Sequence, residues 1–286
     1  MSSESARQSV SRSSNSFLGD FWVNFKRWNL KAVRNPFVLV VSLVQPIIFL
    51  VLFTQVFGGA VGGQLPPGVP NYETYLVPAI AIQVSLAAAA TSGVGLVNDV
   101  ENGMFEKVLV SPMNRAAVFL GKTAAELLRI AVQIGIILGL GIALGAEIDT
   151  GISGALGIVG VGILFSLWFI AFSNTLALIT KDQESTIIGA NLLQFPLLFV
   201  STAFLPLRIL PEWIQTVATF NPISYGVDAA RSLMLGGDWM DVWNPGWFDG
   251  MYDAVIPALL VLGVLDLVLG AVAVYMINRA SSASVK

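Results

Sequence analysis

The sequence predicts an all-α integral membrane protein with six transmembrane helices. Of its 286 residues, 55% are hydrophobic and 12% are charged, whereas soluble domains carry about 25% charged residues. The mean hydropathy is +0.77. The apolar residues also gather in long uncharged runs, as they do in helices that cross a bilayer. We therefore expect a helix bundle surrounded by lipid.

Six of these runs are long enough to span a membrane. A helix rises about 1.5 Å per residue, so about 20 apolar residues cross the hydrocarbon layer. Glycine and proline mark most of the connections between the runs. We expect spans at residues 37–57, 75–97, 119–144, 158–179, 187–205 and 255–277, all within one transmembrane domain at 36–286.

The distribution of lysine and arginine predicts the orientation, because cytoplasmic loops are enriched in these residues. They precede the first span, connect the second to the third and the fourth to the fifth, and follow the sixth. The other loops are mainly acidic and hold only Arg208 and Arg231. We therefore expect a multi-pass protein of the cell membrane with both termini in the cytoplasm. Residues 1–16 are polar and serine-rich, which predicts a disordered cytoplasmic tail without a cleavable signal peptide.

The chain contains no cysteine and no histidine. Disulfides, thiolate nucleophiles, imidazole bases and the usual zinc ligands are thereby excluded. Gly121-Lys122-Thr123 resembles the end of a phosphate-binding loop, but the pattern needs a glycine five residues before Gly121, where Ala116 stands. We expect no catalytic residue, metal or cofactor in this chain and no nucleic-acid partner.

Residues 17–35 predict an amphipathic helix before the first span. Basic residues flank an aromatic stripe, which Asn24 interrupts. The stripe has helical spacing and consists of Phe17, Phe21, Phe25 and Trp28. Such a helix can lie on the inner membrane surface with its lysines and arginines at the phosphates. The alternative is a simple membrane anchor.

The connector between the second and third spans, residues 98–122, is both charged and amphipathic. Its apolar residues recur at helical spacing, with acidic and basic residues around them. Ser111-Pro112 should end this helix, because the residue before a proline avoids the α region, and a second helix should start near Asn114. An amphipathic cytoplasmic helix can dock into a partner; the alternative is a solvated loop.

Residues 206–253 form a long and unusually apolar connection before the last span. Pro211 and Pro222 can each begin a short helix, because proline fits the first helical turn. We expect these helices at 212–220 and 223–235. Their apolar character predicts an extracellular element that re-enters the outer half of the bundle.

Polar side chains inside the predicted spans are candidates for a transport path or gate. A charge at the centre of a bilayer is costly, so Asp266 in the last span should point into the bundle. It is either a transport residue or the partner in an interhelical hydrogen bond. Glu126 and Arg129 in the third span are spaced to pair with each other. The candidate path residues are Gln45, Gln83, Asn191, Gln194 and Asp266.

The order of these elements resembles the permease subunits of ABC-2 type exporters, which include daunorubicin-resistance-like drug exporters and polysaccharide exporters. The matching stretches are 98–112 (NDVENGMFEKVLVSP), 120–122 (LGK) and 220–225 (FNPISY) through Arg231. In that family the first stretch carries a coupling helix, and the last belongs to the extracellular element before the final span.

The resemblance implies a half-transporter. Two copies, or this chain and a related permease, would pair and bind separate ATPase subunits, which would hold the ATP and Mg²⁺. The implied contact residues for the ATPase are Asp99, Glu101, Asn102, Gly103, Met104, Phe105, Glu106, Lys107, Ser111 and Pro112.

The sequence therefore predicts the permease subunit of an ABC exporter, which moves a hydrophobic or amphipathic substrate outward and has no ATPase activity of its own. The alternative is a proton- or ion-coupled secondary transporter that uses Asp266. An intramembrane hydrolase would need a Ser–Lys pair or paired aspartates, and only Asp266 is clearly intramembrane. Whether the cargo is a drug, lipid, glycan or ion stays open.

Overall fold

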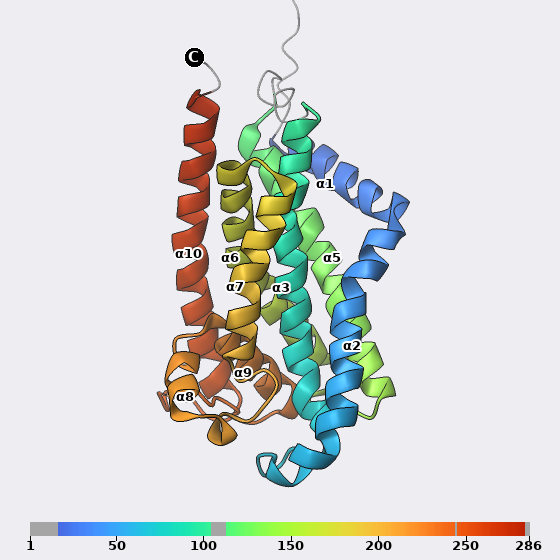
Figure 1. Cartoon of the computed structure of the whole chain (residues 1–286), viewed down its shortest axis with the longest axis vertical. Coiled ribbons are helices and arrows are strands. Elements are labelled where there is room, and N and C mark those ends of the chain that lie inside the picture. Colours follow the sequence, from blue (N-terminus) through green and yellow to red (C-terminus); the bar gives the residue numbers. More distant parts are fainter. Residues whose placement is uncertain (1–16, 104–112, 244, 284–286) are drawn as a thin grey trace, which may run out of the picture.

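The computed structural model describes residues 17–103, 113–243 and 245–283. Within these ranges the chain forms nine α-helices and two short 3-10 helices, and no strand. The long helices run side by side (Figure 1). The first helix of the chain lies across one end of the bundle, and two short helices lie at the other end. Residues 1–16, for which we expect a disordered tail, lie outside the described residues, as does most of the predicted coupling helix.

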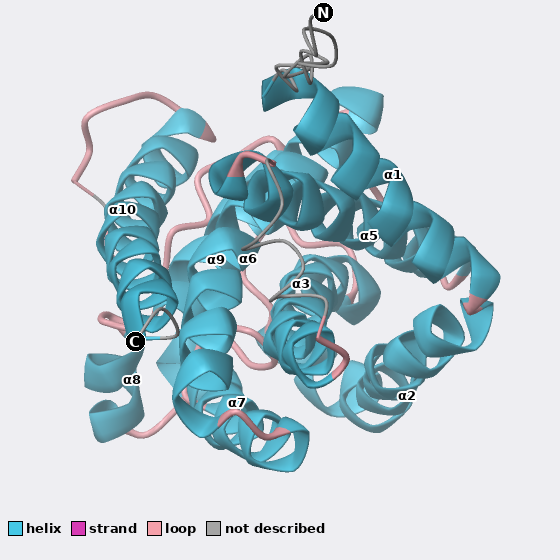
Figure 2. Ribbon diagram, turned by 90° about the horizontal axis from the view of Figure 1, so that it is seen from above, coloured by secondary structure: helices cyan, strands magenta, loops and turns pink. Residues whose placement is uncertain are grey.

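Among the described residues, five helices are long and apolar enough to cross a membrane. They coincide with the first, second, third, fourth and sixth predicted spans. They are α2 (Pro36–Val61), α3 (Tyr72–Glu101), α5 (Arg115–Ala143), α6 (Gly151–Thr180) and α10 (Tyr252–Ala283). The most apolar stretch of α3 is 78% buried, against 22% in α2 and in α10. Accordingly α3 lies inside the bundle, and α2 and α10 lie on its outside (Figure 2).

The predicted fifth span, 187–205, is only partly helical. Its helix is α7 (Gln183–Phe199), whose 17 residues fall short of the roughly 20 needed for a span. The side chain of Asn221 donates to the carbonyl oxygens of Leu197 and Val200, at 2.6 and 2.5 Å. These contacts satisfy the free carbonyls at the helix end, and the chain continues as a buried irregular segment. A count of six spans therefore stays a prediction.

The two short helices predicted after this segment are present. They are α8 (Glu212–Ala218) and α9 (Pro222–Leu235). The side chain of Asn221 caps α9 by accepting the backbone N–H of Ile223 at 3.0 Å. Helix α9 is almost entirely buried and packs against α3, α6 and α10. By contrast, α8 is largely exposed, with Ala218 as its buried residue.

The amphipathic helix predicted at residues 17–35 is α1 (Phe17–Arg34), which lies across the opposite end of the bundle (Figure 1). It packs on α5, where Asp20 and Asn24 are buried. The carboxylate of Asp20 accepts the backbone N–H of Asn114 at 2.8 Å. Asn24, which interrupts the aromatic stripe, therefore belongs to the face against α5, and Trp22 stays exposed on another face.

Candidate functional site

A partly open pocket of about 590 Å³ lies between α1, α2, α3, α5 and α7. It occupies the half of the bundle nearest α1. Its volume is within the range of about 300–1,000 Å³ that is usual for small-molecule sites. Its uncharged polar lining includes Ser42, Gln45, Thr91, Asn98, Asn191 and Gln194. The pocket therefore offers hydrogen-bonding groups within a mainly apolar surface.

Three of the five predicted path residues meet in this pocket. Gln45 comes from α2, whereas Asn191 and Gln194 come from α7 and, three residues apart, share one helix face. The side-chain amide oxygen (Oε1) of Gln194 is buried and has no hydrogen-bond partner in the described part of the chain. The structure thus brings together polar residues that are about 150 positions apart in the sequence, because α2 and α7 both pack on α3.

The other two predicted path residues lie elsewhere. Gln83 is completely buried on α3, and Asp266 lies on α10; neither lines the pocket. The side-chain polar atoms of Gln83 and both carboxylate oxygens of Asp266 have no hydrogen-bond partner among the described residues. Since buried polar groups normally have partners, Asp266 is a notable group whose role the pocket does not explain.

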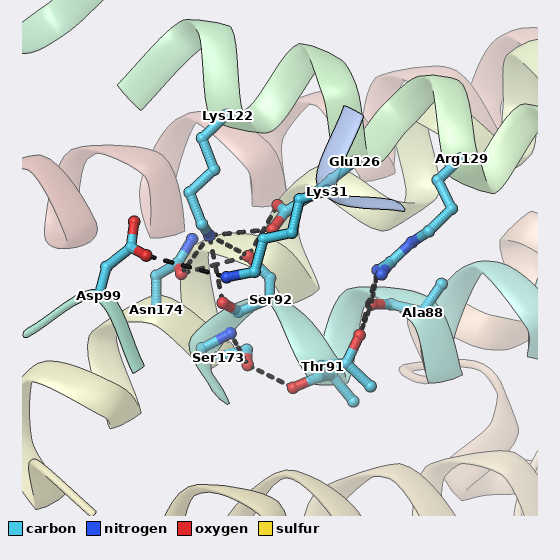
Figure 3. Close-up of polar contacts among 12 residues, drawn as sticks. Lys31, Ala88, Thr91, Ser92, Asp99, Lys122, Glu126, Arg129, Ser173 and Asn174 are labelled. Carbon is cyan, nitrogen blue, oxygen red and sulfur yellow. Dashed lines mark hydrogen bonds and ion pairs between the residues drawn. The ribbon is translucent and has the colours of Figure 1, made fainter. Parts of the chain in front are cut away.

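A buried charge cluster closes one wall of the pocket (Figure 3). The ammonium of Lys122 lies 2.9 Å from a carboxylate oxygen of Glu126, and the other oxygen accepts the hydroxyl of Ser92 at 2.8 Å. Lys122 also donates to the hydroxyl and the carbonyl of Ser92, at 2.9 and 3.1 Å, and to Asn174 at 3.3 Å. The cluster thereby joins α3, α5 and α6.

The predicted pairing of Glu126 with Arg129 is wrong. Glu126 pairs instead with Lys122, one turn earlier on α5. Arg129 lines the pocket and donates to the carbonyl of Ala88 and the hydroxyl of Thr91, at 3.2 and 3.1 Å (Figure 3). In the sequence, Lys122 belongs to an incomplete phosphate-binding pattern and to the family-like stretch 120–122, and neither predicts a buried ion pair. Its spacing from an acid at the start of an apolar helix was the signal that could have identified this buried pair.

Glycine at position 121 has a packing role rather than a phosphate-binding one. A Cβ atom added there would lie 2.6 Å from the carbonyl oxygen of Phe21, closer than side chains normally approach. The absence of a side chain at Gly121 lets the backbones of α1 and α5 touch. The Gly-Lys pair therefore positions α1 and the charge cluster next to each other.

A second set of charges connects α1 to the end of α3. One carboxylate oxygen of Asp99 lies 3.0 Å from the guanidinium of Arg27, and the other lies 4.0 Å from the ammonium of Lys31. The ring of Trp28 lies under both cations and also under Lys122, with centroid distances of 5.4, 4.7 and 5.5 Å. These contacts fix the pocket's rim to the start of the predicted connector.

The residues predicted to contact an ATPase fall into three groups. Asp99 is half-buried and engaged by α1. Glu101 and Asn102 are exposed at the end of α3, where Glu101 accepts a hydrogen bond from Gln183, and Gly103 follows with a positive φ of 65°. The remaining predicted contact residues lie outside the described residues; they are Met104, Phe105, Glu106, Lys107, Ser111 and Pro112.

The part of the chain that matches known proteins includes every helix that lines the pocket. Residues 19–235 match the family model described as ABC-2 type transporter. A daunorubicin resistance ABC transporter permease protein, DrrB1, of Streptomyces coeruleorubidus is 29% identical over 70% of each chain. The putative transport permease ycf38 of Cyanophora paradoxa is 28% identical over 88% of this chain and 87% of its own. A probable doxorubicin resistance ABC transporter permease protein, DrrC, of Mycobacterium tuberculosis is 27% identical over 74% of each chain.

Proposed function

The chain belongs to the ABC-2 type transporter family, and we propose that it is the membrane-spanning permease subunit of an ABC exporter. It moves a hydrophobic or amphipathic substrate outward, using ATP that a separate nucleotide-binding subunit hydrolyses with Mg²⁺. The observation that carries this proposal is the pocket of about 590 Å³ at the α1 end, lined by both amide side chains and apolar surface. A site of this size and chemistry suits an amphipathic small molecule.

The proposal includes an orientation. The chain lies in the cell membrane with the α1 end and both termini on the cytoplasmic side, α1 on the inner leaflet, and α8 and α9 in an extracellular re-entrant element. Helix α7 and the buried segment after it complete a sixth crossing. The distribution of lysine and arginine supports this arrangement, as do the exposed aromatic side chains Phe17 and Trp22 on α1.

Energy reaches the pocket through the connector between α3 and α5. In this proposal the ATPase docks on residues 98–112, and a second copy of the chain, or a related permease, completes the transporter. Asp99 supports this route, because it begins the connector and also pairs with Arg27 of α1, the neighbour of the pocket-lining Trp28. Movement of the connector would then displace both α3 and α1.

The relatives' names support an amphipathic cargo. Two of them are named for resistance to daunorubicin or doxorubicin. A drug-like molecule with a polar and an apolar part fits the mixed lining of the pocket. We therefore assign the pocket to the inward-facing substrate site.

The ATPase interface is tested by co-purification with a candidate ATPase from the same operon. Reversing Glu101 and Glu106 to lysine should abolish co-purification and the substrate-stimulated ATPase activity of the complex. Glu212→Lys, an exposed reversal on α8, is the matched control and should leave both unchanged. Full stimulation in the double reversal would refute docking on the connector.

The second candidate function is proton- or ion-coupled transport, which the unpartnered carboxylate of Asp266 favours. Asp266→Asn separates the two functions. Loss of transport driven by a proton gradient in vesicles without ATP would support the coupled transporter. Unchanged ATP-driven transport in the same variant would support the exporter.

A further inference from the structure

We infer that the pocket selects an anionic amphiphile, with the carboxylate or phosphate head of the ligand held by Arg129 and Lys31. The inference rests on the proposed function, because it names the substrate class of that pocket. Both cations line the pocket, one from α5 and one from α1.

Arg129 has no acidic partner in the described part of the chain. Its two hydrogen-bond acceptors in that part are neutral, the carbonyl of Ala88 and the hydroxyl of Thr91. Its Nε atom is buried without a hydrogen-bond partner there. A guanidinium has five N–H donors in a planar fork, so this arginine has donors left for a ligand. The fork matches the oxygens of a carboxylate or a phosphate.

The acid beside Arg129 does not cancel its charge. Glu126 lines the same pocket, but its two oxygens are engaged by Lys122 and by Ser92, at 2.9 and 2.8 Å. Asp99, which does not line the pocket, is likewise shared between Arg27 and Lys31. The charged residues that line the pocket are therefore two cations, Lys31 and Arg129, and one carboxylate, Glu126, which Lys122 neutralises from behind.

Lys31 is the more available of the two cations. Its ammonium lies 4.0 Å from Asp99, whose closer partner is Arg27 at 3.0 Å, and its side chain is 56% exposed. It can therefore turn towards a ligand at the mouth of the pocket without leaving Asp99 unpaired. Lys31 would attract the anion, and Arg129, deeper on α5, would orient it.

The rest of the pocket lining suits the remainder of an amphiphile. Apolar side chains from α2, α3 and α7 line it, among them Val41, Val94 and Ile187, interspersed with Gln45 and Asn191. This wall can cover a hydrocarbon or ring system and offers amides to a few polar substituents. A cationic head would be repelled by Arg129 and Lys31, so this pocket should disfavour amine drugs such as the daunorubicin and doxorubicin for which two relatives are named.

The test is equilibrium binding to the full-length chain in phosphatidylcholine nanodiscs without any ATPase. Three fluorescent probes carry the same alkyl chain and end in phosphate, hydroxyl or trimethylammonium. The phosphate probe should bind about tenfold more tightly than the hydroxyl probe and more tightly still than the ammonium probe. Equal affinities, or preference for the ammonium probe, would overturn the inference.

Variants locate the head group. Arg129→Gln should weaken the phosphate probe about tenfold while the hydroxyl probe keeps its affinity, which also reports that the pocket is folded. Arg129→Lys should fall between the two. Arg34→Gln, an exposed arginine at the end of α1, is the control and should bind like the unaltered chain. Equal loss with Arg34→Gln would indicate general surface attraction and would refute the assignment to Arg129.

Two further arms complete the experiment. Nanodiscs that contain phosphatidylglycerol should displace the phosphate probe if the anion is a lipid head group, and should leave it bound if the ligand is a soluble amphiphile; both outcomes support an anion site. Stimulation of the ATPase complex by the ammonium or hydroxyl probe, but not by the phosphate probe, would refute the inference and leave the exporter function intact.

Discussion

The guanidinium of Arg231 lies 3.7 Å from the ring centroid of Tyr75, and both side chains are buried. The same arginine donates to the carbonyl of Tyr75 at 3.3 Å, the carbonyl of Thr202 at 3.1 Å and the carboxylate of Asp228 at 3.2 Å. One side chain on α9 thus binds α3 and the irregular segment after α7. This cluster keeps the short α9 inside the bundle, where an unpaired charge would be costly.

Arg231→Met should destabilise the fold strongly, because it leaves Asp228 buried without its counter-ion. The expected loss is about 3–5 kcal/mol, measurable as a lowered melting temperature in detergent. Arg231→Met with Asp228→Asn should recover much of the loss, since no charge is then stranded. Arg208→Met, at an exposed arginine, is the control. A double variant as unstable as the single one would show that the aromatic stacking, rather than the charge, is decisive.

The loss caused by Arg231→Met should depend on pH. Asp228 lies in α9, outside the five long spans, and burial raises its pKa to about 7 although Arg231 lowers it. A carboxyl whose folded pKa is raised has no penalty below its ordinary pKa of 3.8; the penalty grows as pH rises from there and is complete above the folded pKa. Without Arg231 the folded pKa rises further, so the additional loss appears above about pH 7. Removing Arg231 should therefore destabilise the protein less at about pH 5 than at about pH 8. A loss that is equal at both pH values would contradict this account.

Gly121→Ala should loosen α1 from α5. The added Cβ would lie 2.6 Å from the carbonyl of Phe21, and overpacking of this kind costs about 1–3 kcal/mol. We expect a lower melting temperature and altered fluorescence of Trp28, which lies at the junction. Gly135→Ala on the same helix is the control, because a Cβ there meets no atom within 4 Å. Its substitution should be neutral or mildly stabilising.

Gln45→Ala and Asn191→Ala should weaken substrate binding without unfolding the chain, because both side chains line the pocket. Loss of one hydrogen bond predicts a rise of about three- to tenfold in the substrate concentration for half-maximal ATPase stimulation. Gln83→Leu is the informative comparison. Gln83 is buried away from the pocket without a partner among the described residues, so leucine should raise stability and leave stimulation unchanged. A large effect of Gln83→Leu on stimulation would return this residue to the transport path.

The long helices were predictable because each depends on a local apolar run. The end of α7 was not, since the apolar run continues to Leu205 and the helix ends under the influence of Asn221, which is distant in sequence. The charge cluster was missed for the same reason. Ser92 and Asn174 come from other helices. The packing of those helices against α5 explains why Glu126 pairs with Lys122 rather than with Arg129.

The sequence predicted several residues of the pocket but not that they lie together. Polar positions on α2 and α7 stood out within apolar runs, and three of the five predicted ones line it. Gln45 lines the pocket, whereas Gln83 is buried on α3 away from it. Nothing in the local sequence pattern distinguishes these two glutamines. That difference depends on which faces of the helices meet.

Close backbone contacts join α1 to α5 and α3 to α6, and set these helices apart from α2 and α7. A Cβ at Gly93 would lie 2.2 Å from the carbonyl oxygen of Ser173, so α3 and α6 touch there as α1 and α5 touch at Gly121. With the cluster around Lys122, we expect these four helices to move as one body, whereas α2 and α7 meet it through side chains. The separation of α2 and α7 should then change most during transport. Spin labels on these two helices should record large changes in distance, while a pair on α3 and α6 stays constant.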